Sequence, residues 1–394
     1  MPEASLEYLK AQLGELNEAG TALHLRVLED EQKARTRFDG REVINLASNN
    51  YLGLAAHPRM KKAASDAAAR YGAGSGAVRT IAGTMSLHTE LERRFAAFKG
   101  AEAAIMFQSG FAANSGTVAA ILGKEDVIVS DQLNHASIID GARLSRAEIK
   151  VFPHKEAAAA DALLEETRAP GRHQLLITDG VFSMDGDIAP LPALVEVAEK
   201  HGAIMMIDDA HASGVLGKNG RGTVDHFSLH GRVDIQVGTL SKAIGVLGGF
   251  IAGPQHLIDW LVNRGRPFLF STSAPPAVAA ACIEALNILE EEPERVERLW
   301  DRTRFFKKGL QDLGFDTGAS ETPITPVIAG EETKAIELAR LLWEEGVFTP
   351  AIVFPTVPKG RSRVRTIVSA DHSEEDLKEA LDAFDRVGRK LGLI

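Results

Sequence analysis

The chain has 394 residues, of which 45% are apolar and 25% are charged, a composition typical of a globular protein with a large core. Its formal net charge of −10 disfavours general nucleic-acid binding, which needs a basic face. The single cysteine, Cys282, excludes an intramolecular disulfide and a cysteine metal cluster, and we expect no metal site. No signal-peptide pattern and no run of about 18 apolar residues is present, so we expect a cytoplasmic protein without a membrane span.

The middle of the chain alternates short apolar runs with helical patterns. Such runs with helices between them are typical of βα units, so they predict an α/β fold with a mostly parallel sheet and helices on both faces. The expected strands are 103–107, 126–130, 174–178, 203–207 and 234–238.

The pattern changes after about residue 275, where long helices at 277–292 and 293–313 are followed by strand signals at 325–329 and 361–369 and a helix at 373–391. We therefore expect a large domain over 49–290 and a smaller α+β C-terminal domain over 291–394. Residues 1–48 are expected to pack with the small domain.

Three sequence features follow the expected strands, and ligands in such sheets bind at the carboxyl ends of strands. Asp208 and His211 follow 203–207, Lys242 follows 234–238, and Gly110 opens a helix after 103–107. Taken singly, they read as a capped turn, a solvated lysine and an ordinary strand-to-helix turn. Together they supply the carboxylate, the amine and the anion-binding helix start that pyridoxal 5'-phosphate (PLP) requires.

With these groups the chain resembles the α-oxoamine synthase family of PLP-dependent acyltransferases, which has the aspartate-aminotransferase fold (fold type I). The resemblance covers nearly the whole chain in nine collinear stretches. They are NLASNNYLGLAAHP (45–58), YGAGSGAVRTIAGT (71–84), QSGFAAN (108–114), DQLNHASIIDGARL (131–144), TDGVFSMDGDIAPL (178–191), DDAHASGVLG (208–217), GTLSKAIG (238–245), RPFLFSTSAPP (266–276) and RVRTIVSADHS (363–373).

The resemblance implies roles for individual residues around the cofactor. Lys242 would carry PLP as a Schiff base, Asp208 would pair with its pyridine nitrogen, His211 would bond its phenolic oxygen, and His135 would stack on its ring. The residues implied for the phosphate are Gly110, Phe111 and Thr239, with Ser271 and Thr272 reaching the cofactor of the neighbouring subunit. A homodimer with shared active sites is therefore expected.

The substrates of the family are a small amino acid and an acyl-coenzyme A, and the resemblance assigns Asn49, Ser183 and Arg365 to substrate binding. If 359–365 is an extended strand, Lys359, Arg361, Arg363 and Arg365 lie on one side of it. Such a row of cations suits an anion, either the substrate carboxylate, which Arg365 would hold, or the phosphates of coenzyme A. Lys359 and Arg361 are better read as a solvated face. In the N-terminal region, where some relatives have an arginine for longer acyl chains, His24 and Arg26 are left unassigned.

Among activities of the family, stretches 71–84 and 131–144 favour glycine C-acetyltransferase, which condenses glycine with acetyl-CoA to 2-amino-3-oxobutyrate. The alternative is 8-amino-7-oxononanoate synthase of biotin biosynthesis, which joins alanine to a pimeloyl thioester with loss of CO2, and one enzyme could have both activities. A PLP aminotransferase or aldolase stays open as well, whereas the presence of Lys242 disfavours a non-catalytic PLP-fold protein. A nucleotide-binding dehydrogenase is excluded, because the glycine-rich stretch Gly72–Gly76 does not have the G-x-G-x-x-G spacing and no clear helix start follows it.

Overall fold

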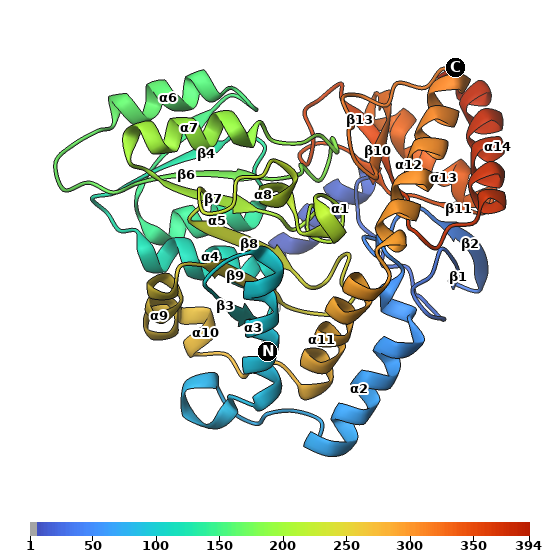
Figure 1. The fold of residues 1–394 in the computed structure, drawn as a ribbon. Coiled ribbons are helices and arrows are strands. Elements are labelled where there is room, and N and C mark those ends of the chain that lie inside the picture. The colour runs from blue at the N-terminus through green and yellow to red at the C-terminus, as the bar shows by residue number, and fades with distance from the viewer. Residues whose placement is uncertain (1–5) are drawn as a thin grey trace.

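The computed structural model describes residues 6–394. Figure 1 shows a large seven-stranded sheet with helices on its faces and, beside it, a smaller α+β part that contains the C-terminus. The expected α/β fold of PLP enzymes of fold type I is confirmed.

The large sheet has the strand order β3-β9-β8-β7-β6-β4-β5. All neighbours are parallel except β9, which is antiparallel to β3 and β8. The strands are β3 (Ala103–Phe107), β4 (Val127–Asp131), β5 (Glu148–Phe152), β6 (Gln174–Asp179), β7 (Ile204–Asp208), β8 (Ile235–Thr239) and β9 (Gly249–Gly253).

Five of these strands were expected from the sequence, and β5 and β9 were not. The five have buried, nearly continuous apolar runs, as strands covered on both faces do. In contrast, β5 lies at the sheet edge with only Phe152 buried, and β9 has glycine at both ends, which leaves a central apolar run of only Phe250 to Ala252. Neither strand carries the apolar pattern on which the prediction depended.

Helices cover both faces of this sheet. One face packs on α4 (Gly110–Ile121), α5 (Ala136–Ser145) and α9 (Gln255–Arg264), and the other packs on α6 (Ala157–Glu166) and α7 (Leu191–His201). The remaining helices around the sheet are η2 (Leu54–Ala56), α2 (Pro58–Tyr71), η3 (Arg79–Gly83), α3 (Ser86–Lys99), η4 (Lys218–Gly220), α8 (Thr223–His226), α10 (Arg266–Leu269) and α11 (Pro276–Glu291).

The smaller part combines both ends of the chain. Its core packs α12 (Glu294–Leu313), α13 (Glu332–Glu344) and α14 (Glu374–Leu391) against a sheet of β10 (Ile324–Gly330), β13 (Ser362–Ile367) and β12 (Ala351–Ile352). A second sheet joins β1 (Arg35–Phe38) and β2 (Arg41–Asn45) to β11 (Val347–Phe348). The division into 1–48, 49–290 and 291–394 stays a prediction.

The strand expected at 361–369 corresponds to β13, but the extended conformation considered for 359–365 does not hold at its start. β13 begins at Ser362, and Gly360 has a φ of 78° in a turn where Arg361 N donates to Pro358 O. Lys359 and Arg361 therefore precede the strand, whereas Arg363 and Arg365 lie on it. The turn sequence Pro358, Lys359, Gly360 is the physical reason, since proline and glycine favour turns.

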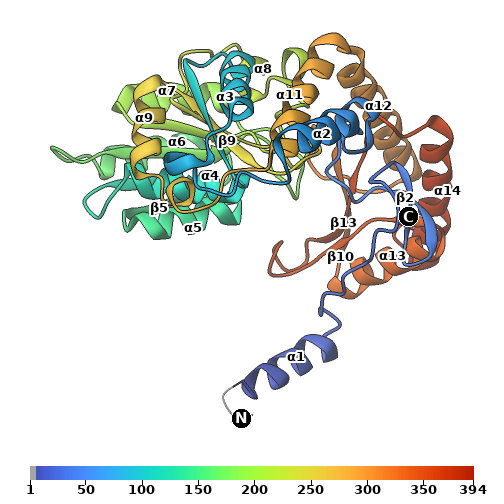
Figure 2. The same ribbon diagram turned by 90° about the horizontal axis from the view of Figure 1, so that it is seen from below.

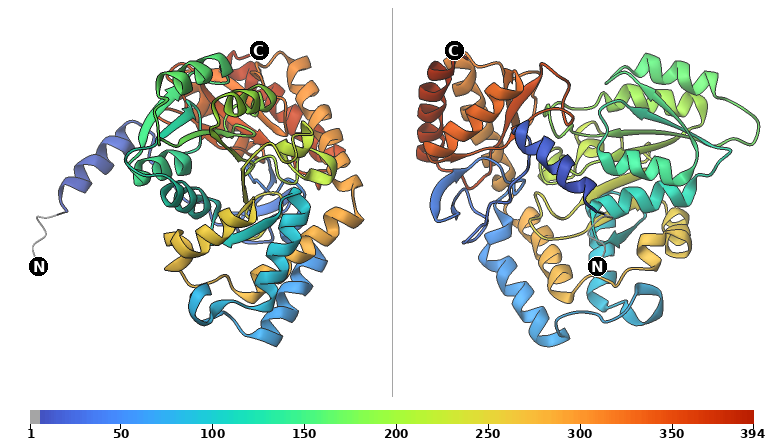
Figure 3. Two further views of the ribbon diagram at one scale, coloured as in Figure 1. Left: turned by 60° about the vertical axis from the view of Figure 1, so that its left-hand side comes forward. Right: turned by 180° about the vertical axis from the view of Figure 1, so that it is seen from behind.

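Helix α1 (Tyr8–Glu18) projects away from the rest of the chain (Figures 2 and 3) and has no buried residue. Across residues 6–394, no helix combines the length and the apolar character needed to cross a membrane.

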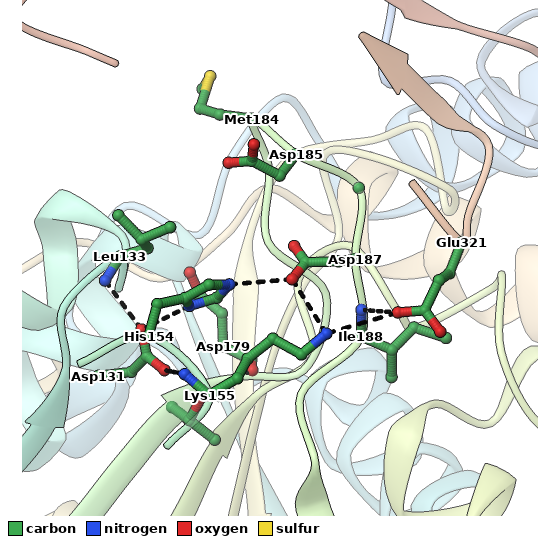
Figure 4. Close-up of polar contacts among 12 residues, drawn as sticks. Asp131, Leu133, His154, Lys155, Asp179, Met184, Asp185, Asp187, Ile188 and Glu321 are labelled. Carbon is green, nitrogen blue, oxygen red and sulfur yellow. Dashed lines mark hydrogen bonds and ion pairs between the residues drawn. The ribbon is translucent and has the colours of Figure 1, made fainter. Parts of the chain in front are cut away.

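An ionic cluster fixes two loops at the carboxyl edge of the sheet; we call Asp131, His154, Lys155, Asp187 and Glu321 the His154 cluster (Figure 4). The ring of His154 contacts Asp131 Oδ1 at 3.0 Å and Asp187 Oδ2 at 2.9 Å, and Lys155 Nζ lies 3.1 Å from Asp187 Oδ2. Asp131 precedes the turn to His135, and Asp187 lies in the loop that carries Ser183. The cluster therefore holds together the two loops that lead to these residues.

The charge of His154 depends on these partners. Burial alone would lower its pKa, but the hydrogen bonds and charges of Asp131 and Asp187 raise the pKa from 6.5 to about 9. A shift of this size corresponds to on the order of 3 kcal/mol. Because the folded-state pKa is raised, this stabilisation is complete below pH 6.5 and is lost as the pH rises through about 9.

We predict that His154→Gln lowers the stability of the protein by roughly 3 kcal/mol near pH 6, because buried Asp131 loses its cation and Asp187 keeps only Lys155. The difference in thermal unfolding midpoint between wild type and variant should shrink at about pH 10. His256→Gln, on an exposed position of α9, is the matched control. A loss of stability in His154→Gln that is independent of pH would contradict a charged His154 between Asp131 and Asp187.

Candidate active site

One cavity of about 230 Å³ lies where β3, β6, β7 and β8 end. Parallel strands bring their carboxyl ends to one edge of a sheet, which is where such folds bind ligands. The lining residues are Ser109, Gly110, Phe111, Asn114, His135, Ser137, Asp179, Val181, Ser183, Asp208, Ala210, His211, Thr239, Ser241 and Lys242.

Asp208 ends β7 and is buried, with 4% of its surface exposed. Its Oδ2 accepts a hydrogen bond of 2.6 Å from Asn114 Nδ2, and its Oδ1 accepts one of 2.8 Å from Ala210 N. The next residue, Asp209, pairs at 2.7 Å with Lys99, and both side chains are fully buried. Asp208 is thus held as a hydrogen-bonded carboxylate on a fixed turn.

Lys242 follows β8 and faces the same cavity as Asp208. Burial lowers the pKa of its amine from 10.5 to about 8, although the charges of Asp208 and Asp179 oppose the shift. Within residues 6–394 this amine has no hydrogen bond or ion pair to another side chain. A buried amine with a lowered pKa is partly unprotonated near neutral pH and can attack a carbonyl.

His211 is buried, and its Nδ1 lies 2.7 Å from the hydroxyl of Tyr51. Burial lowers the pKa of His211 well below 6.5, and the nearby charges of Lys242 and Arg365 lower it further. The ring is therefore neutral at physiological pH. Since Tyr51 contacts one ring nitrogen, the other is available to a ligand in the cavity.

His135 caps the start of α5, and two contacts fix its position. Its backbone N donates to Asp179 Oδ2 at 3.0 Å, and its Nδ1 lies 2.8 Å from Ser137 Oγ. Asp179 ends β6 opposite Asp208 in the register of β6 and β7. Burial and the charge of Asp208 raise the pKa of Asp179 well above its usual value, which favours the neutral form of Asp179.

An anion-binding corner lies at the start of α4. Ser109 caps this helix by accepting from Ala112 N at 3.0 Å, while the first amides of a helix have no partner within it and attract anions. Glycine at position 110 allows a close approach to the end of β8, since a Cβ there would lie 3.1 Å from Thr239 Cβ. The hydroxyls of Thr239 and Ser241, 2.8 Å apart, complete the corner.

These residues fit PLP. The cavity combines a free amine for the aldehyde, a buried carboxylate for the pyridine nitrogen and an anion-binding helix start for the phosphate. Eight of the twelve residues singled out from the sequence line it, namely Gly110, Phe111, His135, Ser183, Asp208, His211, Thr239 and Lys242.

The other four predicted residues lie outside the cavity lining. Arg365 is adjacent to it, since its Nη1 donates to Ser183 O at 3.0 Å. Asn49 is half-buried, and its Oδ1 has no partner within the described chain. Ser271 and Thr272 lie at the start of a segment where Gln108 donates to their carbonyl oxygens. Their side chains do not line the cavity of their own chain.

Several residues of the site were not singled out from the sequence, namely Tyr51, Asn114, Ser137, Asp179 and Ser241. Asp179 could have been found, because it ends an apolar strand in the same way as Asp208. Asn114 lies one helical turn beyond Gly110, so it shares a helix face with the anion-binding corner. Tyr51 is distant in sequence from every element of the cavity, and no local pattern marks it.

The chain is similar to known proteins over nearly its full length. Residues 41–384 match the family described as aminotransferase class I and II. The chain is 60% identical to 8-amino-7-oxononanoate synthase of Symbiobacterium thermophilum, over 99% of this chain and 100% of the relative. It is 59% identical to the same enzyme of Thermoanaerobacter pseudethanolicus, over 99% and 98% of the two chains.

Solved structures agree on the fold. Serine palmitoyltransferase of Sphingomonas wittichii superposes with a TM-score of 0.94 at 32% identity over 100% of both chains. Another serine palmitoyltransferase structure, which contains PLP, has a TM-score of 0.94 at 31% identity and the same coverage. An 8-amino-7-oxononanoate synthase from Francisella tularensis has a TM-score of 0.75 at 26% identity, over 89% of this chain and 99% of the other.

The relatives contradict the expected glycine C-acetyltransferase activity, because those at 54–60% identity over nearly the full length are named 8-amino-7-oxononanoate synthase. The motifs that favoured glycine and acetyl-CoA include His135 and Ser137, which line the cofactor cavity. These motifs therefore reflect the cofactor chemistry that the whole family shares, and they do not indicate the length of the acyl chain.

The cavity, the fold and the full-length relatives lead to one conclusion. The chain belongs to the aminotransferase class I and II family and, within it, to the PLP-dependent α-oxoamine synthases.

Proposed function

We propose that this protein is an 8-amino-7-oxononanoate synthase that joins alanine to a pimeloyl thioester. The observation that carries the proposal is the full-length similarity, at 60% identity, to an enzyme of that name. It is supported by a cavity whose lining includes an amine, a carboxylate and a helix start suited to the cofactor. In the overall reaction the alanine Cα forms a bond to the acyl carbon, the thiol leaves, and the alanine carboxylate leaves as CO2.

The amino-acid carboxylate would bind Arg365. This guanidinium is half-buried beside the cavity, and its Nε has no partner within residues 6–394. Its Nη1 is held by Ser183 O, so the side chain is oriented before substrate binds. An oriented guanidinium can hold a carboxylate bidentately. Asn49, whose buried Oδ1 also lacks a partner among the described residues, would accept a hydrogen bond from a substrate or from Arg365.

The bound cofactor supplies an electron sink for the electron pair left at the amino-acid Cα. Asp208, held by Asn114 and Ala210 N, would keep the proton on the pyridine nitrogen. Lys242, once displaced by the amino acid, would take the Cα proton, and its lowered pKa suits a general base near neutral pH. His135 would cover the ring, and neutral His211 would bond the phenolic oxygen.

The active enzyme would be a homodimer with shared sites. Ser271 and Thr272 do not line the cavity of their own chain, and they follow Phe270, which is 73% exposed. Ile81 is 83% exposed and lies near the bridge between Val78 and Thr272. Such exposed apolar side chains are typical of an interface. The use of coenzyme A as the thiol and a cytoplasmic location stay predictions.

Thiol release tests the substrate pair directly. We expect kcat/KM for alanine with pimeloyl-CoA to exceed that for glycine with acetyl-CoA by at least about 100-fold, with 8-amino-7-oxononanoate identified by mass spectrometry. A preference for glycine with acetyl-CoA would contradict the proposal. Conversion of the cofactor to its amine form by alanine without any thioester would indicate a transaminase instead.

Asp208→Asn should bind the cofactor but lose roughly 100- to 1000-fold in kcat, because an amide cannot stabilise the charged pyridine nitrogen. Exchange of the alanine Cα proton with solvent deuterium, followed by NMR without thioester, isolates this step. Asp312→Asn, at an exposed position of α12, serves as the control. Proton exchange at the wild-type rate in Asp208→Asn would mean that another group stabilises the charged pyridine nitrogen.

A further inference from the structure

We propose that a pocket beside the active-site cavity binds the distal part of the acyl chain and that Arg361 pairs with its terminal carboxylate. This inference rests on the proposed function and names its specificity determinant. The pocket, of about 160 Å³, lies between the loop of Phe182 to Asp185 and the segment of Thr356 to Arg363. We call it the side pocket, and Figure 4 draws Leu133, Met184 and Asp185 from its lining next to the His154 cluster.

The side pocket adjoins the candidate active site at Ser183, which lines both. The same residue contacts Arg365 through its carbonyl oxygen, so it lies where the amino-acid carboxylate would bind. An acyl group placed for attack by the amino-acid Cα therefore has the side pocket as a neighbouring space. A long acyl chain can enter that space, whereas an acetyl group is too short to occupy it.

The walls of the side pocket suit methylene groups. They include Leu133, Phe182, Met184, Val357 and Pro358. Phe182 and Val357 are buried in the fold, which fixes the apolar floor. Methionine adapts its shape to a flexible chain, and transfer of each methylene from water to such walls is favourable.

Two arginines line the side pocket, and only one of them is already paired within the described residues. Arg363 is 2% exposed and donates from Nη1 to Asp185 Oδ1 at 2.6 Å and to Met184 O at 3.0 Å. The guanidinium of Arg361 has no hydrogen bond or ion pair within residues 6–394, and the residue is exposed. The pocket therefore offers one uncompensated cation.

The backbone at Arg361 is nevertheless fixed. Its N donates to Pro358 O at 3.1 Å, and its O accepts from Arg363 Nε at 3.0 Å. The acid in the lining, Asp185, is used by Arg363. A ligand that has an apolar chain and an anionic end matches both the walls and the remaining charge, and a pimeloyl group has this chemistry.

The test compares pimeloyl-CoA with heptanoyl-CoA, which has the same number of acyl carbons and a methyl group in place of the carboxylate. In Arg361→Gln we expect KM for pimeloyl-CoA to rise about tenfold with kcat retained, as loss of a partly exposed ion pair predicts. The values for heptanoyl-CoA should stay within about twofold of wild type, and Arg361→Lys should restore part of the preference.

Lys359→Gln is the matched control, because Lys359 is an exposed cation two residues away that lies over Phe354 at 5.2 Å and does not line the side pocket. This variant should keep the wild-type preference. Equal changes for both thioesters in Arg361→Gln, or an effect of Lys359→Gln as large as that of Arg361→Gln, would overturn the assignment.

Calorimetric binding to the wild-type holoenzyme separates this inference from the proposed function. Tighter binding of pimeloyl-CoA than of heptanoyl-CoA, lost in Arg361→Gln, supports the side pocket even if alanine proves not to be the co-substrate. Equal affinities of the wild type for the two thioesters overturn the inference, even if alanine and pimeloyl-CoA are turned over.

Discussion

The site depends on a buried amine and a buried carboxylate that face one cavity at the ends of adjacent strands. Lys242 follows β8 and Asp208 ends β7, and the two strands are parallel neighbours. Burial alone would disfavour the charged form of each group. The fold compensates with hydrogen bonds from Asn114 and Ala210 N to Asp208, and among residues 6–394 it leaves the Lys242 amine without a side-chain partner. This amine is therefore available to an aldehyde, and the carboxylate is held for a positively charged ring nitrogen.

The rest of the structure supports this pair from both sides. On one side, the fully buried ion pair of Lys99 and Asp209 anchors the turn after β7. On the other, the loop that carries Ser183 joins the two parts of the chain, because its carbonyl and side-chain groups contact Arg363 and Arg365. The His154 cluster ties the same loop to the end of β4 (Figure 4). Substrate groups that bind Arg365 would thus act on the loop that also lines the cofactor cavity.

Much of this arrangement could be predicted from the sequence, and the failures have physical causes. Buried parallel strands have continuous apolar runs, so the strands ending near Asp208 and Lys242 were found, whereas edge strand β5 was not. The strand at β13 was found, but the row of basic residues considered for 359–365 is interrupted by the turn at Gly360. Tyr51 reaches His211 across 160 residues of sequence, and only the tertiary fold brings them together. The predicted substrates, glycine and acetyl-CoA, were wrong. The motifs that favoured them bind the cofactor, are common to the family and contain no information on acyl length.

The attachment point of the cofactor tests the central claim most directly. Borohydride reduction of the holoenzyme converts the imine between lysine and cofactor into a stable bond, and peptide mass spectrometry then identifies the modified lysine. The account predicts the phosphopyridoxyl group on the peptide that contains Lys242. Lys307 is an internal comparison, because burial also lowers its pKa to about 8 but it donates to Ser320 O and Thr322 O, away from the cavity. Labelling of Lys307 or of any lysine other than Lys242 would contradict the account.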